Sequence, residues 1–224
     1  LASPKVGRMC LKWFEELTSA VELDEAYLYL PTLDYAAQKY GPGSSADNAA
    51  FREFRSQLEG LADLCQRRGC ELSVAGDYEI TPVTEEPVVP NVILRREGLF
   101  AVRSVGGMAY PDFYQSTAFA MCDHEFCVLY GPEASKASEL LLATGDYERP
   151  ADQTGNQTIL LAKPGSWCDY AWWPDRREAP DFASHVDIHN KPGYDPRELF
   201  FFNRGFVRGT HGRACAIAQS QKGS

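Results

Sequence analysis

The stretch that decides the fold runs from AYLYLP (26–31) through LDYAAQKYGPGSSAD (33–47) and a long helical pattern to ELSVAG (71–76). The first and last of these segments are short apolar runs, which are typical of buried strands. Between them, apolar residues recur at helical spacing over about 47–68, with Ser45 or Asp47 as the cap and Gly69 after the end. Residues 26–76 are therefore predicted to form a β-α-β unit with two parallel strands.

The rest of the chain alternates helical and strand patterns less regularly. CLKWFEELTSAVEL (10–23), VPNVILRREG and SKASELLLAT (135–144) indicate helices, and GLFAVRS, STAFAMCDHEFCVLYG and QTILLAKP (157–164) indicate strands. We predict an α/β fold with a mixed, largely parallel sheet flanked by helices on both faces. One domain is expected over 1–224, with 84–165 as a candidate sub-lobe and 214–224 as a flexible tail.

Charge and cysteine content narrow the classes of protein. The formal net charge of -9 over 224 residues disfavours a nucleic-acid polymer as partner, whereas a small phosphate ester held by cations is compatible with it. The sequence contains 7 cysteines, and no two of them form a C-x-x-C pair. The odd number argues against a closed disulfide framework and favours a reducing compartment. No apolar run reaches about 18 residues, and the first residues lack the apolar stretch of a signal peptide. We expect a soluble intracellular protein, in the cytoplasm or an organelle lumen, with no membrane partner.

Two aspartates follow the predicted parallel strands. Asp34 comes just after the first strand and Asp77 just after the second. Ligands of open parallel sheets bind outside the carboxyl ends of the strands, and neighbouring strands lie roughly 5 Å apart. Two carboxylates that close repel each other unless a cation lies between them. Each aspartate taken alone is as readily a turn former or a helix cap.

Histidines gather near the end of the chain. His185, His189 and His211 lie among Asp181, Asp187 and Asp195, and imidazole and carboxylate are standard zinc ligands. The alternative for each is a loop histidine that bonds the backbone. Asp123 and His124, between two predicted strands, are either a turn or a further pair of ligands. The aromatic residues of the WCDYAWW segment (167–173) either form core or stack on a base.

Taken together, the segments resemble a known family. YLPTLDYAAQKYGPGS resembles the Y-x-P-x-x-D-x-x-G-H-x-x-G-P segment of the nucleotide pyrophosphatase/phosphodiesterase branch of the alkaline phosphatase superfamily, with Gln38 where the family has His. GDYEITPV resembles S-D-H-G-M-T-P-V, with Tyr78 and Glu79 in place of His and Gly. RGTHG resembles the terminal G-x-H-G motif. The block APDFASHVDIHNKPGYDPRELFFF is similar to a bacterial-type subgroup of alkaline phosphatase family proteins, in which a D-H pair also precedes a strand.

The resemblance implies a site with two divalent cations, zinc or alternatively manganese. The residues implied to bind them are Asp34 and His211, with Gln38 as a candidate, at one ion and Asp77, with Glu79 as a candidate, at the other. His189, Asp123 and His124 are reserve ligands. The implied reaction is hydrolysis of a small phosphodiester or phosphomonoester. The family's Thr or Ser nucleophile belongs to a portion that should precede Leu1, and no counterpart is found. Either the polypeptide is truncated, or a separate chain supplies that half, or the protein is a non-catalytic scaffold that retains the fold.

Overall fold

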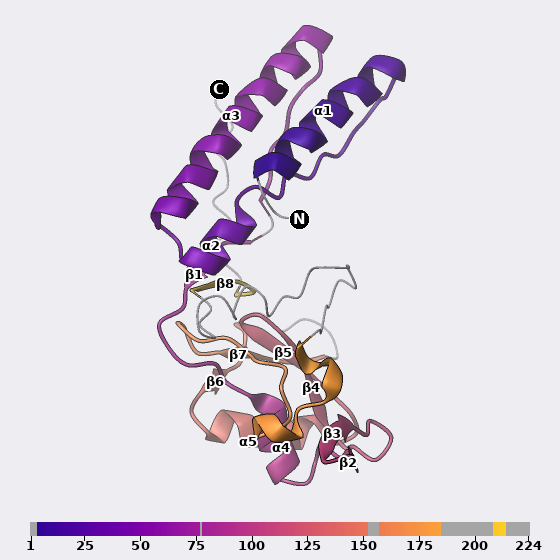
Figure 1. The fold of residues 1–224 in the computed structure, drawn as a ribbon, viewed down its shortest axis with the longest axis vertical. Helices are drawn as coiled ribbons and strands as arrows, with labels where there is room; N and C mark the ends of the chain where they lie inside the picture. The colour runs from indigo at the N-terminus through magenta and orange to yellow at the C-terminus, as the bar shows by residue number, and fades with distance from the viewer. Residues whose placement is uncertain (1–3, 77, 152–156, 185–207, 214–224) are drawn as a thin grey trace. The chain divides into compact units, whose positions relative to one another are not determined.

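The computed structural model describes residues 4–76, 78–151, 157–184 and 208–213. It contains both helices and short strands, so the mixed α and β character predicted from the sequence is confirmed. The chain divides into two compact units (Figure 1). Unit 1 comprises 1–82 and 187–209, and unit 2 comprises 83–186 and 210–224. Whether 1–224 forms the predicted single domain with a sub-lobe over 84–165 stays a prediction.

Unit 1 is built on three helices, α1 (Pro4–Ala20), α2 (Asp34–Tyr40) and α3 (Ser45–Arg68). The long helix predicted over 47–68 is confirmed, but its cap is Ser44, whose Oγ accepts the backbone N–H of Asp47 at 3.1 Å. Gly69 ends α3 with a φ of 68°, in the left-handed region that favours glycine. Capping at both ends explains why α3 begins and stops where it does.

The two predicted parallel strands of this unit are not found. Residues 26–31 and 71–76 are extended and run back along α1 and α3 toward α2, but neither forms a strand (Figure 1). Tyr27 is 89% exposed, Tyr29 66% and Val74 59%. A strand requires a neighbouring backbone for its ladder of hydrogen bonds, and no segment that the structure describes provides one here. The β-α-β prediction is therefore wrong for the described residues, because an apolar run specifies a tendency for burial and not a partner.

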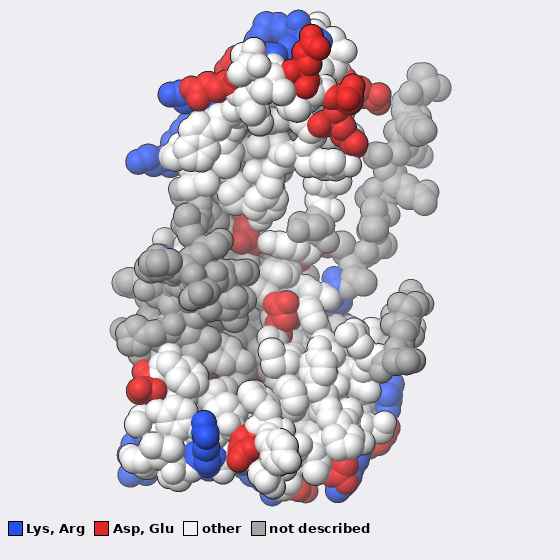
Figure 2. Space-filling model, turned by 90° about the vertical axis from the view of Figure 1, so that its right-hand side faces the viewer, with Lys and Arg blue, Asp and Glu red and all other residues white. Residues whose placement is uncertain are grey.

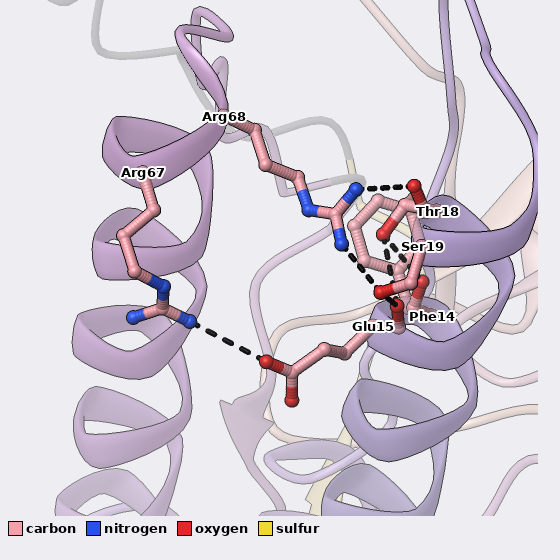
Figure 3. A network of polar contacts seen from close by, with 6 residues as sticks. All are labelled: Phe14, Glu15, Thr18, Ser19, Arg67 and Arg68. Atoms are coloured by element: carbon pink, nitrogen blue, oxygen red, sulfur yellow. Dashed lines mark hydrogen bonds and ion pairs between the residues drawn. The ribbon is translucent and has the colours of Figure 1, made fainter.

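Polar contacts hold α1 against α3. At the end of the helix pair, Arg68 donates to the carbonyl of Thr18 and the hydroxyl of Ser19, and Arg67 pairs with Glu15 at 3.4 Å (Figure 3). Arg8 pairs with Glu53 toward the other end of the pair.

A buried polar pair lies under α1. The hydroxyl of Thr32 donates to Gln57 Oε1 at 2.6 Å, and both side chains are buried. A Cβ at Gly7 would lie 2.4 Å from Thr32 Oγ1 and 2.6 Å from Gln57 Oε1. Glycine at position 7 therefore allows the close approach of α1 to this pair.

Unit 2 contains the larger sheet. Its helices are α4 (Pro90–Arg96) and α5 (Ala134–Ala143), and its strands are β2 (Val102–Val105), β3 (Met108–Pro111), β4 (Phe119–Asp123), β5 (Phe126–Tyr130), β6 (Tyr147–Glu148) and β7 (Thr158–Ala162). Two 3₁₀ turns follow, η1 (Arg176–Glu178) and η2 (Asp181–Ser184). The helices and strands that the sequence predicted at these places are confirmed.

The sheets are small, and the pairings of β2 to β7 are antiparallel. β2 pairs with β3, and a four-stranded sheet has the order β4-β5-β7-β6 with antiparallel neighbours throughout. Two-residue strands β1 (Thr81–Pro82) and β8 (Gly209–Thr210) form a further sheet. The prediction of a large, mainly parallel sheet is not met in the described residues. The hairpin connection between β4 and β5 is too short for a parallel crossover, which explains why this pair is antiparallel.

The apolar core of unit 2 lies between α4, α5 and the four-stranded sheet. Its fully buried side chains include Leu94, Leu141 and Leu160, and a smaller cluster forms around Trp173. Asn91 of α4 is a buried polar residue at this core. Its Nδ2 donates to the carbonyl of Ala120 at 2.8 Å, and its Oδ1 accepts the N–H of Ala120 at 2.8 Å. No helix among the described residues is long and apolar enough to cross a membrane.

Candidate functional site

Asp34 of unit 1 lies in the first turn of α2, where its carboxylate receives two hydrogen bonds. Gln38, one helical turn later on the same face, donates from Nε2 to Asp34 Oδ1 at 2.6 Å. The hydroxyl of Tyr78, from the segment after 71–76, donates to the same oxygen at 3.0 Å. Gln38 is buried, and its backbone carbonyl accepts the N–H of Arg208 at 3.2 Å. The structure thus brings Asp34 and Gln38 together as the sequence predicted, and adds Tyr78.

This arrangement does not fit a divalent cation at Asp34. A cation site needs lone pairs that converge on one point, whereas Gln38 and Tyr78 both direct protons at Asp34 Oδ1. An inverted amide would place Gln38 Oε1 at 2.6 Å from another acceptor with no proton between them, so the donor orientation is the favourable one. The Asp34 carboxylate is a hydrogen-bond acceptor for both side chains in this arrangement.

Asp123 and His124 of unit 2 lie at the tight turn between β4 and β5. The register pairs Asp123 with Phe126, so His124 and Glu125 form a two-residue hairpin loop. His124 has a φ of 52°, and no other non-glycine residue in the described ranges has a positive φ. A left-handed residue is what such a tight hairpin turn demands, so the conformation has a structural cause.

The same turn brings together two histidines that are far apart in the sequence. The ring centroids of His124 and His211 are 3.7 Å apart, with 33° between the ring planes. Three backbone contacts fix this arrangement: Glu125 N–H donates to the carbonyl of His211 at 2.9 Å, Arg213 N–H donates to Glu125 Oε2 at 2.9 Å, and Cys168 N–H donates to the carbonyl of His124 at 2.6 Å. Glu125 is buried with 1% exposure, and its carboxylate bonds the backbone that follows His211.

The side chains at His124 and His211 are better ligands for a divalent cation than the groups around Asp34. Imidazole and carboxylate are both cation ligands, and Asp123 Oδ1 lies 3.7 Å from His124 Nε2. Among the residues that the structure describes, however, no group of three or more His, Cys, Asp or Glu is arranged to hold a metal ion. Asp77 and His189 lie outside the described residues. The metal-binding roles of the predicted residues therefore stay predictions.

Three cysteines form a buried cluster beside this turn that the sequence did not indicate. Cys122 lies opposite Cys127 across β4 and β5, and Cys127 and Cys168 are almost completely buried. Burial raises the pKa of the Cys122 thiol, and a hydrogen bond with Cys127 together with burial raises the pKa of Cys168. All described cysteines are free thiols. Cys168 lies 41 positions beyond Cys127 in the sequence, so no spacing rule could have found the cluster.

The sequence matches the family model described as type I phosphodiesterase / nucleotide pyrophosphatase over residues 3–195. No curated protein and no solved structure matches the chain. The match spans most of the 224 residues and covers both of the first two segments on which the resemblance rested. The chain belongs to the type I phosphodiesterase / nucleotide pyrophosphatase family, within the alkaline phosphatase superfamily.

Proposed function

We propose that this chain is part of a hydrolase of phosphoric esters that acts on a small phosphodiester or phosphomonoester. The match to the phosphodiesterase family over residues 3–195 carries this proposal. The net charge of -9 supports a small substrate, because a polyanion would be repelled along most of the surface. The catalytic nucleophile is not assigned to a residue of this chain.

We further propose that His124 and His211, with Asp123, contribute to a divalent cation site of this hydrolase. The contact between the His124 and His211 rings supports this assignment, because it brings two imidazoles together, and Asp123 Oδ1 lies 3.7 Å from His124 Nε2. A bound zinc or manganese ion would neutralise charge on phosphoryl oxygens during displacement. The protein's own contribution is to hold both imidazoles in place through the backbone bonds of Glu125 and Cys168.

The test is elemental analysis of the purified chain by plasma mass spectrometry after equilibration with zinc or manganese. Wild type is expected to retain about one ion per chain, because a site with three protein ligands binds zinc tightly. His124→Ala and His211→Ala should each lose that ion. Asp146→Asn is the matched control, since Asp146 is an exposed acid of unit 2 outside the site and should leave the content unchanged.

A second measurement addresses the reaction itself. Inorganic phosphate and adenosine monophosphate serve as probes of a product site, and binding of either should require the ion and disappear in His211→Ala. Zinc content that does not change in either histidine variant contradicts the cation site. Phosphate binding that is absent in wild type, with zinc present, contradicts the hydrolase.

A second candidate function is a non-catalytic scaffold that retains the family fold. The hydrogen bonds that Asp34 receives from Gln38 and Tyr78 favour it, because they occupy a carboxylate that the resemblance assigned to a cation. A scaffold should bind neither zinc nor phosphate and should be indifferent to chelator. The same two measurements therefore distinguish the candidates.

A further inference from the structure

The cluster around Asp34 joins two segments that are distant in the sequence. Asp34 and Gln38 are separated by one turn of α2, while Tyr78 lies 44 positions beyond Asp34. Both donors meet at Asp34 Oδ1, at 2.6 Å and 3.0 Å. One carboxylate oxygen therefore links the short helix α2 to the chain that follows residues 71–76.

The surroundings favour a fixed arrangement of these groups. Gln38 is 5% exposed, and Asp34 and Tyr78 are half-buried. The chain at 208–209 packs on the same turn of α2: Arg208 N–H bonds the carbonyl of Gln38, and a Cβ at Gly209 would lie 2.4 Å from the carbonyl of Ala37. A buried amide that lost its partner would be desolvated without a compensating bond. The hydrogen bond therefore satisfies the buried amide of Gln38 as well as the carboxylate of Asp34.

The charge of Asp34 is met by neutral donors. A carboxylate that accepts hydrogen bonds from an amide and a phenol is stabilised without a cation, since such charge-assisted bonds are stronger than neutral ones. To reach Oδ1, a divalent ion would have to displace both protons and then find lone pairs on a phenol and an inverted amide. Those are weaker ligands than the imidazoles that the family motifs carry at the positions of Gln38 and Tyr78.

We propose that Asp34, Gln38 and Tyr78 form a cation-independent triad that holds α2 to residues 78–80, in place of the ion that the resemblance assigns to Asp34. This inference rests on the proposed function in one respect, because it compares the triad with the two-ion site of the family. Its consequence is that any metal content of the chain is independent of Asp34. The triad stabilises the fold of unit 1 with or without divalent ions.

Thermal unfolding with and without zinc tests the triad. Tyr78→Phe removes one donor and keeps the ring, and should lower Tm by about 2–4 °C in chelator and by the same amount in excess zinc. Tyr27→Phe is the matched control, because the Tyr27 hydroxyl bonds Glu25 in an 89% exposed position of the same unit, and its Tm should not change. A Tyr78→Phe variant with the Tm of wild type in chelator would overturn the triad.

Metal content gives a second readout that does not depend on stability. Zinc per chain should be equal in wild type and Asp34→Asn, which keeps the size of the side chain. Loss of an ion in Asp34→Asn would overturn the proposal, and so would an increase in the Tm of wild type by zinc that Asp34→Asn abolishes. His124→Ala and His211→Ala report on the proposed function instead, so failure of one proposal is distinguished from failure of the other.

A gain-of-binding variant completes the test. The double substitution Gln38→His with Tyr78→His places two imidazoles beside Asp34 and should bind about one more zinc per chain than wild type. That additional ion should disappear when Asp34→Asn is added. An unchanged zinc content in the double variant would count against the assignment of this cluster to a metal position of the family.

Discussion

Units 1 and 2 are stabilised by different kinds of contact. Both of the apolar core clusters found among the described residues belong to unit 2, where Leu94, Leu141 and Leu160 have 0% exposure. In unit 1, the buried residues include the polar side chains of Thr32, Gln38 and Gln57. Unit 2 therefore follows the usual rule of apolar burial, whereas unit 1 depends to a larger extent on hydrogen bonds between side chains.

Both units leave some large apolar side chains exposed. In unit 1, Trp13 is 58% exposed and Tyr29 66%, and in unit 2 Phe113 is 53% exposed and Tyr114 94%. On the face of unit 1 seen in Figure 2, charged side chains gather at the end of α1 and α3, and the surface next to them carries few charges. Since buried apolar area is the dominant stabilising contribution in folding, unit 1 is expected to be the less stable unit.

The largest expected effect is that of truncating the core of unit 2. Leu160→Ala removes a fully buried side chain from β7, an inner strand of the four-stranded sheet, and should lower the free energy of unfolding by about 3–4 kcal/mol. Urea unfolding followed by tryptophan fluorescence measures it, since three of the four tryptophans belong to unit 2. Leu17→Ala in α1 is the control and should cost under about 0.5 kcal/mol. Equal costs would remove the distinction between the units.

Thiol reactivity compares the two units at single residues. Cys70 is exposed after α3, while Cys127 and Cys168 in unit 2 are 0% and 2% exposed. Reaction requires the thiolate, and the raised pKa of Cys168 leaves less thiolate at pH 8 than an ordinary cysteine has. Cys70 should react with a disulfide reagent at least about 100-fold faster than Cys127 and Cys168, because the latter require local opening.

The control for this measurement is the protein in urea, where burial is lost and the thiols should react at similar rates. Because the pKa of Cys168 is raised, its reaction should require a higher pH than that of an ordinary thiol, even where the thiol is reached by local opening. Fast labelling of Cys168 in the folded protein would mean that the core of unit 2 opens as readily as unit 1. Mass spectrometry of the labelled peptides identifies which residue reacts.

Asn91 tests whether polar contacts also stabilise unit 2. Its side chain is 4% exposed and bonds both the N–H and the carbonyl of Ala120 at 2.8 Å. Asn91→Ala leaves two buried backbone groups without partners and should cost about 2 kcal/mol in urea unfolding. Asn48→Ala is the control, since Asn48 bonds the carbonyls of Gly43 and Ser44 from an exposed position and should cost under about 1 kcal/mol. A smaller loss for Asn91 than for Asn48 would contradict this account.

Local signals explain what could be predicted from the sequence. The spacing of apolar residues and the Gly after the last turn predicted α3, although the cap is Ser44, and the Asp123-His124 junction predicted the pair β4 and β5. Both are properties of contiguous residues. The family could be predicted as well, because its motifs are also contiguous and occur in a fixed order.

Strand pairing and the tertiary contacts of the site could not be predicted, because sequence patterns do not specify which segments lie next to each other. AYLYLP and ELSVAG have the composition of strands, but composition does not say which backbone lies alongside, and neither segment forms a strand. At the candidate site, Asp34 and Gln38 are one helical turn apart and were found, whereas the donor role of Tyr78 and the contact of His124 with His211 arise from tertiary structure. The family motif has a metal-binding His at the position of Tyr78. A tyrosine hydroxyl can donate a hydrogen bond, and this was the one sequence signal for the bond from Tyr78 to Asp34.

The smallest expected change in the free energy of unfolding comes from the arginines at the end of α3, which compare an ion pair with hydrogen bonds in unit 1. Arg67 and Glu15 are paired at 3.4 Å with side chains 61% and 57% exposed, so solvent and salt screen their attraction, and Arg67→Ala should cost no more than about 0.5 kcal/mol. Arg68→Ala removes the bonds to the Thr18 carbonyl and the Ser19 hydroxyl and should cost about 1 kcal/mol, with little dependence on salt. Thermal unfolding in low and high salt measures both. If Arg67→Ala were the more costly change, and high salt abolished the difference, unit 1 would be stabilised by charge rather than by the hydrogen bonds that distinguish it from unit 2.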